Sequence, residues 1–213
     1  KQLTWLQRNS EALSRLAQMR VMAKSGQTGS RTLAEMKAVD GRYPLFGGFS
    51  LRGGKKLADA LAVRNSQHGA VVEQQLLDKL GLAVGDAVQV GQASFEIRAV
   101  IKREPDRSSQ VFRLGPRLMV SLTGMKATGL IQPGSLVRYY YRVVLAPEAS
   151  FKKWIEDLNA AFPDAGWRIR SVDNAAPNIQ RFTNRVALFL SLVGLTTLLV
   201  GGVGIATGVT SFL

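Results

Sequence analysis

From Val186 to its end at Leu213 the chain contains no charged residue and no histidine. All 28 Lys and Arg and all 15 Asp and Glu residues precede this run, the last being Arg185. A helix over the run would be about 42 Å long, and the hydrocarbon core of a bilayer is about 30 Å thick. A helix buried in a soluble core, the alternative, is usually shorter and carries a polar face. The run therefore predicts one transmembrane helix.

The second half of this run is rich in glycine. Gly204 and Gly208 are four residues apart, and Gly201 and Gly202 lie just before them. In lipid, small residues allow two helix backbones to approach closely. We therefore expect these four glycines to be helix-packing residues. Glycine is also frequent in helices that contact only lipid, and this alternative stays open.

Charge and composition bound the partners and the chemistry. The net charge of +13 could serve nucleic acid or anionic lipid, but the charges are scattered and form no long block of one sign, which favours an ordinary solvated surface. The chain has no Cys and a single histidine, His68, so disulfides, cysteine-based zinc sites and multi-histidine metal sites are excluded.

The rest of the chain mixes helical and strand patterns without a regular alternation, which indicates an α+β domain. Apolar residues spaced along positions 3–20 predict a loose helix, and "LAEMKAVDGRYPLFGG" predicts a strand that ends in turns at Asp40-Gly41 and Gly47-Gly48. A helical face that Gly81 ends is predicted at Val72, Leu76, Leu77 and Leu80. Alternating segments on both sides of Gly91 predict a β-hairpin.

Further elements follow towards the apolar run. Strands are predicted at "RLMVSL", "SLVRYYYRVVLA" and "WRIRSV", and "PEASFKKWIEDLNAAF" predicts an amphipathic helix that Pro163 ends. A last helix begins near Pro177, capped by Asp173 or Asn174. Because no breaker separates it from Val186, we expect one continuous helix from the domain into the membrane.

No stretch of the sequence predicts an active site. "GGFSLRGGKK" is glycine-rich and basic, but Phe49 and Lys56 stand where a phosphate loop needs Gly and Ser or Thr. His68 lies in a polar segment and is expected to be solvated. Glu104 and Asp106 flank a proline and are expected to form a turn with local Arg pairs. We therefore predict no catalytic residue, no metal ligand and no cofactor-binding residue.

Tyr139, Tyr140 and Tyr141 follow one another in a predicted strand. Such a run could stack on bases, as in proteins that bind single-stranded nucleic acid. In a strand, however, its members alternate between the two faces, which favours packing at a sheet edge and core. We expect no nucleic-acid partner.

Several segments resemble one family. "LSLVGLTTLLVGGVGIATGVTSFL" is similar to the first helix of the FtsX-like permease domain of MacB- and LolE-type ABC transporter permeases. "EMKAVDGRYPLFG", "LLDKLGLAVGDAVQVGQASFEIRAVIKREPDR" and "LGPRLMVSL" with "ATGLIQPGSLVRYYYRV" resemble the YbbP-type branch of these permeases. The resemblance covers about residues 33–213.

The resemblance implies a domain organisation. Residues 1–180 would be a periplasmic core domain, and residues 181–213 the transmembrane helix that opens the FtsX-like permease domain of a longer chain in the bacterial inner membrane. The periplasmic domain would have two lobes, a small strand-rich lobe of about residues 85–120 set into a mixed α/β lobe formed by residues before 80 and after 135.

The resemblance also implies a function. The chain would belong to a permease that couples ATP hydrolysis by a separate cytoplasmic ABC ATPase to export or extraction of hydrophobic, lipid-like compounds, without a cofactor of its own. Expected partners are that ATPase, a second permease copy, membrane lipid and a periplasmic esterase or lysophospholipase. The alternative is a membrane-anchored basic domain that binds anionic lipid or nucleic acid.

Overall fold

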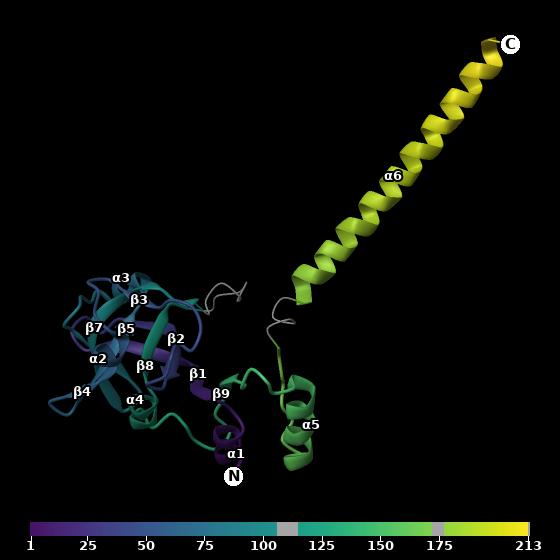
Figure 1. The fold of residues 1–213 in the computed structure, drawn as a ribbon. Coiled ribbons are helices and arrows are strands. Elements are labelled where there is room, and N and C mark those ends of the chain that lie inside the picture. Colours follow the sequence, from purple (N-terminus) through teal and green to yellow (C-terminus); the bar gives the residue numbers. More distant parts are fainter. Residues whose placement is uncertain (106–114, 172–176, 213) are drawn as a thin grey trace. The chain divides into compact units, whose positions relative to one another are not determined.

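The computed structural model describes residues 1–105, 115–171 and 177–212 (Figure 1). The chain divides into two compact units, Lys1–Ala161 and Phe162–Leu213. The first is a mixed α+β domain built on a large sheet, and the second contains one long apolar helix. The predicted α+β class with an apolar helix after it is confirmed.

The elements of the first unit alternate irregularly between helix and strand. In chain order they are α1 (Gln2–Arg8), β1 (Ala12–Ser25), β2 (Arg31–Val39), β3 (Ser50–Leu51), α2 (Leu57–Leu61), β4 (Val63–Arg64), β5 (Gln67–Val72), α3 (Gln74–Leu80), β6 (Ala87–Val90), β7 (Ala93–Arg103), β8 (Arg117–Ser121), α4 (Leu122–Ala127), β9 (Arg138–Val144) and α5 (Phe151–Ala161). The described part of the second unit contains α6 (Pro177–Phe212).

The sheet closes on itself. Its strands follow the order β3-β7-β6-β1-β2-β8-β5-β4, and β5 also pairs with β7 in parallel. The six strands from β7 through β6, β1, β2 and β8 to β5 therefore form a barrel. β9 lies outside the ring and pairs antiparallel with the first half of β1. β1 is 14 residues long, and this length allows it to serve both the barrel and β9.

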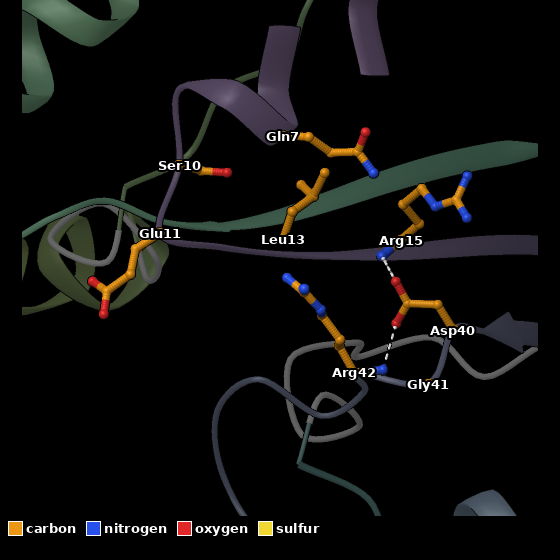
Figure 2. A pocket seen from close by; sticks show the side chains of 8 residues that line it. All are labelled: Gln7, Ser10, Glu11, Leu13, Arg15, Asp40, Gly41 and Arg42. Atoms are coloured by element: carbon orange, nitrogen blue, oxygen red, sulfur yellow. Dashed lines mark hydrogen bonds between the residues drawn. The ribbon is translucent and has the colours of Figure 1, made fainter. Parts of the chain in front are cut away.

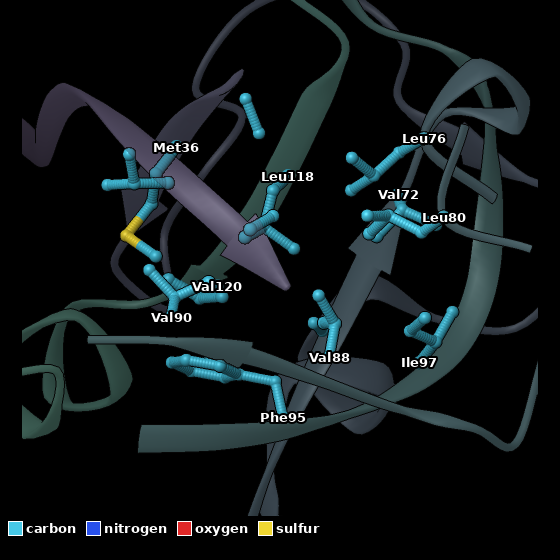
Figure 3. Close-up of a cluster of buried hydrophobic side chains, with 14 of the residues drawn as sticks. Met36, Val72, Leu76, Leu80, Val88, Val90, Phe95, Ile97, Leu118 and Val120 are labelled. Carbon is cyan, nitrogen blue, oxygen red and sulfur yellow. The ribbon is translucent and has the colours of Figure 1, made fainter. Parts of the chain in front are cut away.

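Alternate residues of the barrel strands point into its interior (Figure 3). Met36, Leu118, Val120 and Phe95 are each fully buried there. Burying such a side chain contributes about 1.5–3 kcal/mol. In Figure 1, α3 lies at the upper end of the barrel and α4 at the lower end, and both add apolar side chains to this core.

The intervening residues form a second core on the outside of the barrel. Val71, Ala99 and Met119 belong to this outer cluster, and the segment from Tyr43 to Leu61 supplies the side chains that cover them. The segment includes β3 and α2. Successive residues of β5, β7 and β8 thus point alternately into the barrel and towards the second layer that covers its outer surface.

The structure differs from the sequence prediction in three places. The described part of residues 85–120 does not form a separate lobe, because β6, β7 and β8 share one closed sheet with β1, β2 and β5. The helix predicted over residues 3–20 is wrong: α1 ends at Arg8, and β1 begins at Ala12. Residues 167–171 of "WRIRSV" adopt no strand.

The other predicted elements are confirmed, except that Val72, predicted on the helical face, is the last residue of strand β5, and α3 begins at Gln74. Gly81 ends α3 in the left-handed conformation, with φ of 63°. β6 and β7 form the hairpin around Gly91. Helix α6 runs without interruption from Pro177 into the apolar run. The predicted capping residues Asp173 and Asn174 lie outside the described residues.

Candidate functional site

Helices α1 and α5 lie side by side at one end of the first unit. The rings of Trp5 and Trp154 are 5.5 Å apart between centroids, at an interplanar angle of 57°. The indole Nε1 of Trp154 donates a hydrogen bond of 2.6 Å to the carbonyl oxygen of Asn9. The last helix of the unit is thus bonded to the turn between its first helix and its first strand.

That turn is rigidly bonded on its own side as well. The Asn9 amide donates to the carbonyl of Trp5 over 2.8 Å, and the Ser10 hydroxyl donates to the carbonyl of Leu6 over 2.6 Å. The backbone N–H of Glu11 then donates to the carbonyl of Val144 in β9. The end of α1 is therefore fixed to β1, β9 and α5 together.

A cleft of about 480 Å³ opens beside this junction (Figure 2). Its lining comes from the end of α1, the start of β1 and the turn after β2: Gln7, Ser10, Glu11, Leu13, Arg15, Asp40, Gly41 and Arg42. The Asp40 carboxylate accepts bonds from the Ser14 hydroxyl (2.8 Å) and from the backbone N–H groups of Arg15 (2.7 Å) and Arg42 (3.1 Å). Asp40 therefore closes a structural clamp between β1 and β2.

The long helix α6 carries the predicted membrane segment. Residues Arg185–Gly202 have a mean hydropathy of 1.8, and none of this window is buried within the structure. This is long and apolar enough to cross a membrane by length and composition. Gly201 and Gly202 have no neighbouring atom within 4 Å where a side chain would begin. The predicted helix-packing role of these two residues, and of Gly204 and Gly208, stays a prediction.

The structure brings together a buried ionic cluster that the sequence analysis missed. Lys37 Nζ lies 2.8 Å from Glu104 Oε1, and both side chains have no exposed surface. Arg117 Nε donates to the other oxygen of Glu104 over 3.1 Å. Tyr43 OH, 2.9 Å from Lys37 Nζ, and Glu35, 3.1 Å from Arg117, complete the cluster. We expected local Arg pairs for Glu104, and this was wrong; Asp106 lies outside the described residues.

Two other sequence predictions have clear outcomes. His68 is not a solvated loop residue, since it lies in β5, half-buried, with its ring centroid 6.0 Å from that of Phe95. The tyrosines divide as expected: Tyr139 is 56% exposed, whereas Tyr140 packs against the outer core. The described residues contain no group of three or more His, Asp or Glu side chains that could hold a metal ion.

Comparison with known proteins places this architecture in a family. The family of MacB-like periplasmic core domains matches residues 4–161, which is more than half of the chain. The chain is 29% identical over 182 residues to the uncharacterized ABC transporter permease YbbP of Escherichia coli K12. The alignment covers 84% of this chain and 21% of that protein, so the chain spans about a fifth of its curated relative.

A solved structure shows the same fold. The crystal structure of the periplasmic region of MacB from Actinobacillus actinomycetemcomitans superposes with a TM-score of 0.52 and 14% sequence identity, covering 83% of this chain and 77% of that chain. Domains of this family are parts of ABC permeases and are not themselves catalytic, and they bind no cofactor. The chain therefore belongs to the MacB-like periplasmic core domain family, and it is the periplasmic domain of an inner-membrane ABC permease with a candidate membrane helix after it.

Proposed function

We propose that this chain is the part of a permease subunit that transmits conformational change between the membrane and the periplasm. ATP hydrolysis by a separate cytoplasmic ABC ATPase would drive the change, and its result would be export or extraction of hydrophobic, lipid-like compounds. The observation that carries this proposal is the continuity of α6, 36 residues from Pro177 to Phe212.

A helix of this length spans about 54 Å, which exceeds the hydrocarbon thickness of about 30 Å. Pro177 is its only proline and stands at its first position, where proline does not disturb the helix. Sharp kinks arise mainly at internal prolines, glycine pairs and bulges. The helix before Gly201 can therefore move as one rigid rod, as domain closures require.

Because α5 is the last described helix before α6 in the chain, we propose its junction with α1 as the place where such a motion enters the barrel. The bond from Trp154 to Asn9 and the Asp40 clamp connect these helices to β1 and β2. Because β1 belongs to the barrel over much of its length, a displacement of α1 or α5 would move the barrel as a body rather than bend one loop.

The topology of the proposal follows the family. Residues 1–180 lie in the periplasm, and residues 181–213 form the membrane helix that runs towards the cytoplasm. Arg181 and Arg185 would then flank the outer side, against the positive-inside tendency. Long domains translocate largely regardless of charge, so this tendency does not decide the orientation. The further partners are a second permease copy and a periplasmic esterase or lysophospholipase.

The test compares a flexible with a rigid insertion after Arg181 in the full-length permease, reconstituted with its ATPase. The flexible insertion is seven Gly and Ser residues. Its matched control is an insertion of seven Ala-rich residues, which continue the helix. Seven residues make about two full helical turns, so the control also keeps the rotational position of the residues that follow. This chain has no Cys, so one cysteine introduced at Gly26 carries a spin label specifically once any cysteine of the full-length permease outside this chain is replaced. We expect ATP to change the distance between labels of two copies in the parent and in the rigid variant. An unchanged response in the flexible variant would contradict rod-like transmission.

The glycine-packing part of the proposal needs its own variant. Gly204→Leu should weaken association of two permease copies in the membrane at least fivefold, measured by energy transfer between labelled copies, because leucine keeps the backbones apart. Gly194→Leu is the control, since Gly194 lies in the same apolar run outside the glycine-rich segment. Equal association of both variants would show that the glycines contact only lipid.

A further inference from the structure

A second cleft lies at the end of the barrel near α3. It is shallow and open to solvent, with a volume of about 540 Å³. Four segments line it: the turn after β3, one side of α3, the loop before β6 and the middle of β7. The lining includes two cations, Arg52 and Lys55, and the apolar side chains of Leu77, Leu82, Val84 and Val100.

The turn after β3 presents two cations to this cleft. Arg52 and Lys55 are separated by Gly53 and Gly54, which both adopt left-handed conformations, with φ of 81° and 70°. This segment is part of the glycine-rich, basic stretch that failed as a phosphate loop. Two consecutive glycines allow the chain to reverse tightly, so that both cations project from one short turn.

Neither cation is neutralised by a carboxylate among the described residues. The Arg52 guanidinium donates to Gln74 Oε1 over 2.8 Å, and Lys55 Nζ donates to the backbone carbonyl of Arg98 over 3.4 Å. Asp78 is one step removed, bonded to the amide of Gln74. No Asp or Glu is part of the described lining of the cleft. The rim therefore carries two positive charges with uncharged hydrogen-bond partners.

Arg98 also lines the cleft, but unlike Arg52 and Lys55 it has a carboxylate partner among the described residues. It is buried, and its guanidinium donates to Glu96 over 2.7 Å and to the carbonyls of Ala60, Ala62 and Gln67. Its charge is thus compensated within the fold, and an anion in the cleft would meet Arg52 and Lys55 instead.

The floor of the cleft is apolar. Leu77, Leu82 and Val100 are buried by the fold but contribute to the lining, and Val84 at the margin is 50% exposed. Among the described residues, the lining contains no aromatic ring on which a nucleobase could stack. A free phosphate would leave the apolar floor unused, and a neutral apolar molecule would leave the two cations unpaired.

We propose that this cleft binds a single-chain anionic amphiphile, with its head group between Arg52 and Lys55 and its chain over Leu77, Leu82 and Val84. The inference rests on the proposed function in one respect only: it assigns such a molecule to the lipid-like compounds that the permease handles. Binding itself requires neither ATP nor the ATPase.

The test uses the full chain in nanodiscs of zwitterionic phosphatidylcholine. Three photoactivatable diazirine probes are compared: a fatty acid, a lysophosphatidic acid and a lysophosphatidylcholine. Mass spectrometry maps the labelled peptides. We expect both anionic probes to label residues 74–84 and 98–100 at least fivefold more than the zwitterionic probe does, and an excess of unlabelled fatty acid to compete.

The double variant Arg52→Gln/Lys55→Gln should reduce this labelling about tenfold. Its control, Lys126→Gln/Lys153→Gln, removes the same charge from two exposed positions on α4 and α5 and should label like the parent. Val84→Glu, which adds a negative charge to the rim, should also reduce labelling. The inference is wrong if the Arg52/Lys55 variant labels like its control, or if the zwitterionic probe labels equally. Such a failure leaves the transmission mechanism untouched, because the insertion after Arg181 tests it separately.

Discussion

Lys37 is a cation without exposed surface, held beneath the segment that follows β2. Its partner Glu104 also accepts from Arg117, so one carboxylate contacts two buried cations from β2 and β8, and Glu35 is a further ion-pair partner of Arg117. Another carboxylate, Glu73, accepts from the backbone N–H of Arg117. A buried ion pair is weak evidence for added stability, but removal of one member leaves an uncompensated charge.

We therefore predict that Glu104→Gln lowers the free energy of unfolding by about 3–5 kcal/mol. Lys37→Met should cost less, because Glu104 then keeps Arg117 as its partner. Glu156→Gln is the control, because Glu156 is exposed on α5 and exposed charges contribute about 1 kcal/mol or less. Chemical unfolding of the chain in mild detergent, followed by the sheet signal in circular dichroism, measures all three. Similar losses for Glu104→Gln and Glu156→Gln would contradict this account.

Asp86 makes the stability of the domain depend on pH at the acid end. The backbone N–H of Ala83 and then the Gln27 amide donate to this carboxylate, and they lower its pKa below the ordinary value of 3.8. Because the folded pKa is the lower one, the contribution is complete above about pH 3.8 and is lost as the pH falls through the folded pKa. Asp86→Asn should flatten the stability profile below that pH, measured by thermal unfolding from pH 2 to 6; an unchanged profile would exclude this role.

These residues show the limit of prediction from sequence. Glu104 stands between Arg103 and Pro105, and nothing local indicates that its partners are 67 and 13 positions away. Lys37 fits the alternation of β2 as a polar, outward residue, and this is correct for the barrel. Lys37 is nevertheless buried, because the segment from Tyr43 to Leu61 covers the outer face of the barrel. This segment has no strong periodicity, so the sequence did not indicate that it would do so.

At the scale of elements, the contact of α5 with α1 depends on Trp154. Trp154→Ala should therefore increase amide exchange at the end of α1 and the start of β1 at least tenfold, with the barrel strands unchanged, because both the ring contact and the bond to Asn9 are lost. Trp154→Phe keeps most of the ring contact and should have a smaller effect, of about 1 kcal/mol. Hydrogen exchange with mass spectrometry measures both, with Lys153→Ala as control. Protection that is unaffected in Trp154→Ala would show that the helices are not coupled.

Elements with strong local signals were predictable, and those that depend on distant pairing were not. α3, the hairpin at Gly91 and α5 have regular periodicity and clear ends. β1 contains Leu13 and Leu16 at a spacing that also fits a helix, and it becomes a strand because β2, β6 and β9 all pair with it. The strand expected at residues 167–171 has alternation but pairs with no described strand. The glycines of α6 were found from sequence, whereas the lining of both clefts required the fold.

At the scale of the whole molecule, the proposed topology makes one decisive prediction. The barrel should lie in the periplasm, although the chain carries a net charge of +13 and two arginines close before the apolar run. A charged domain of this size is translocated as a unit, so all of its surface should be accessible from one side. This chain has no Cys, so single cysteines in the full-length permease report on their own positions once any cysteine outside this chain is replaced. Suitable positions are Gly26 in the turn between β1 and β2, and Lys126, exposed on α4.

In the full-length permease, a maleimide that cannot cross the inner membrane should label Gly26→Cys and Lys126→Cys equally in cells with a permeabilised outer membrane. A cysteine placed at Leu195, near the middle of the apolar run, is the matched control and should not react until detergent is added, because hydrocarbon excludes the charged reagent. Labelling of the two barrel positions only after lysis of the inner membrane would reverse the topology. It would also remove the proposed transmission mechanism, since α6 would then carry motion to the wrong side of the membrane.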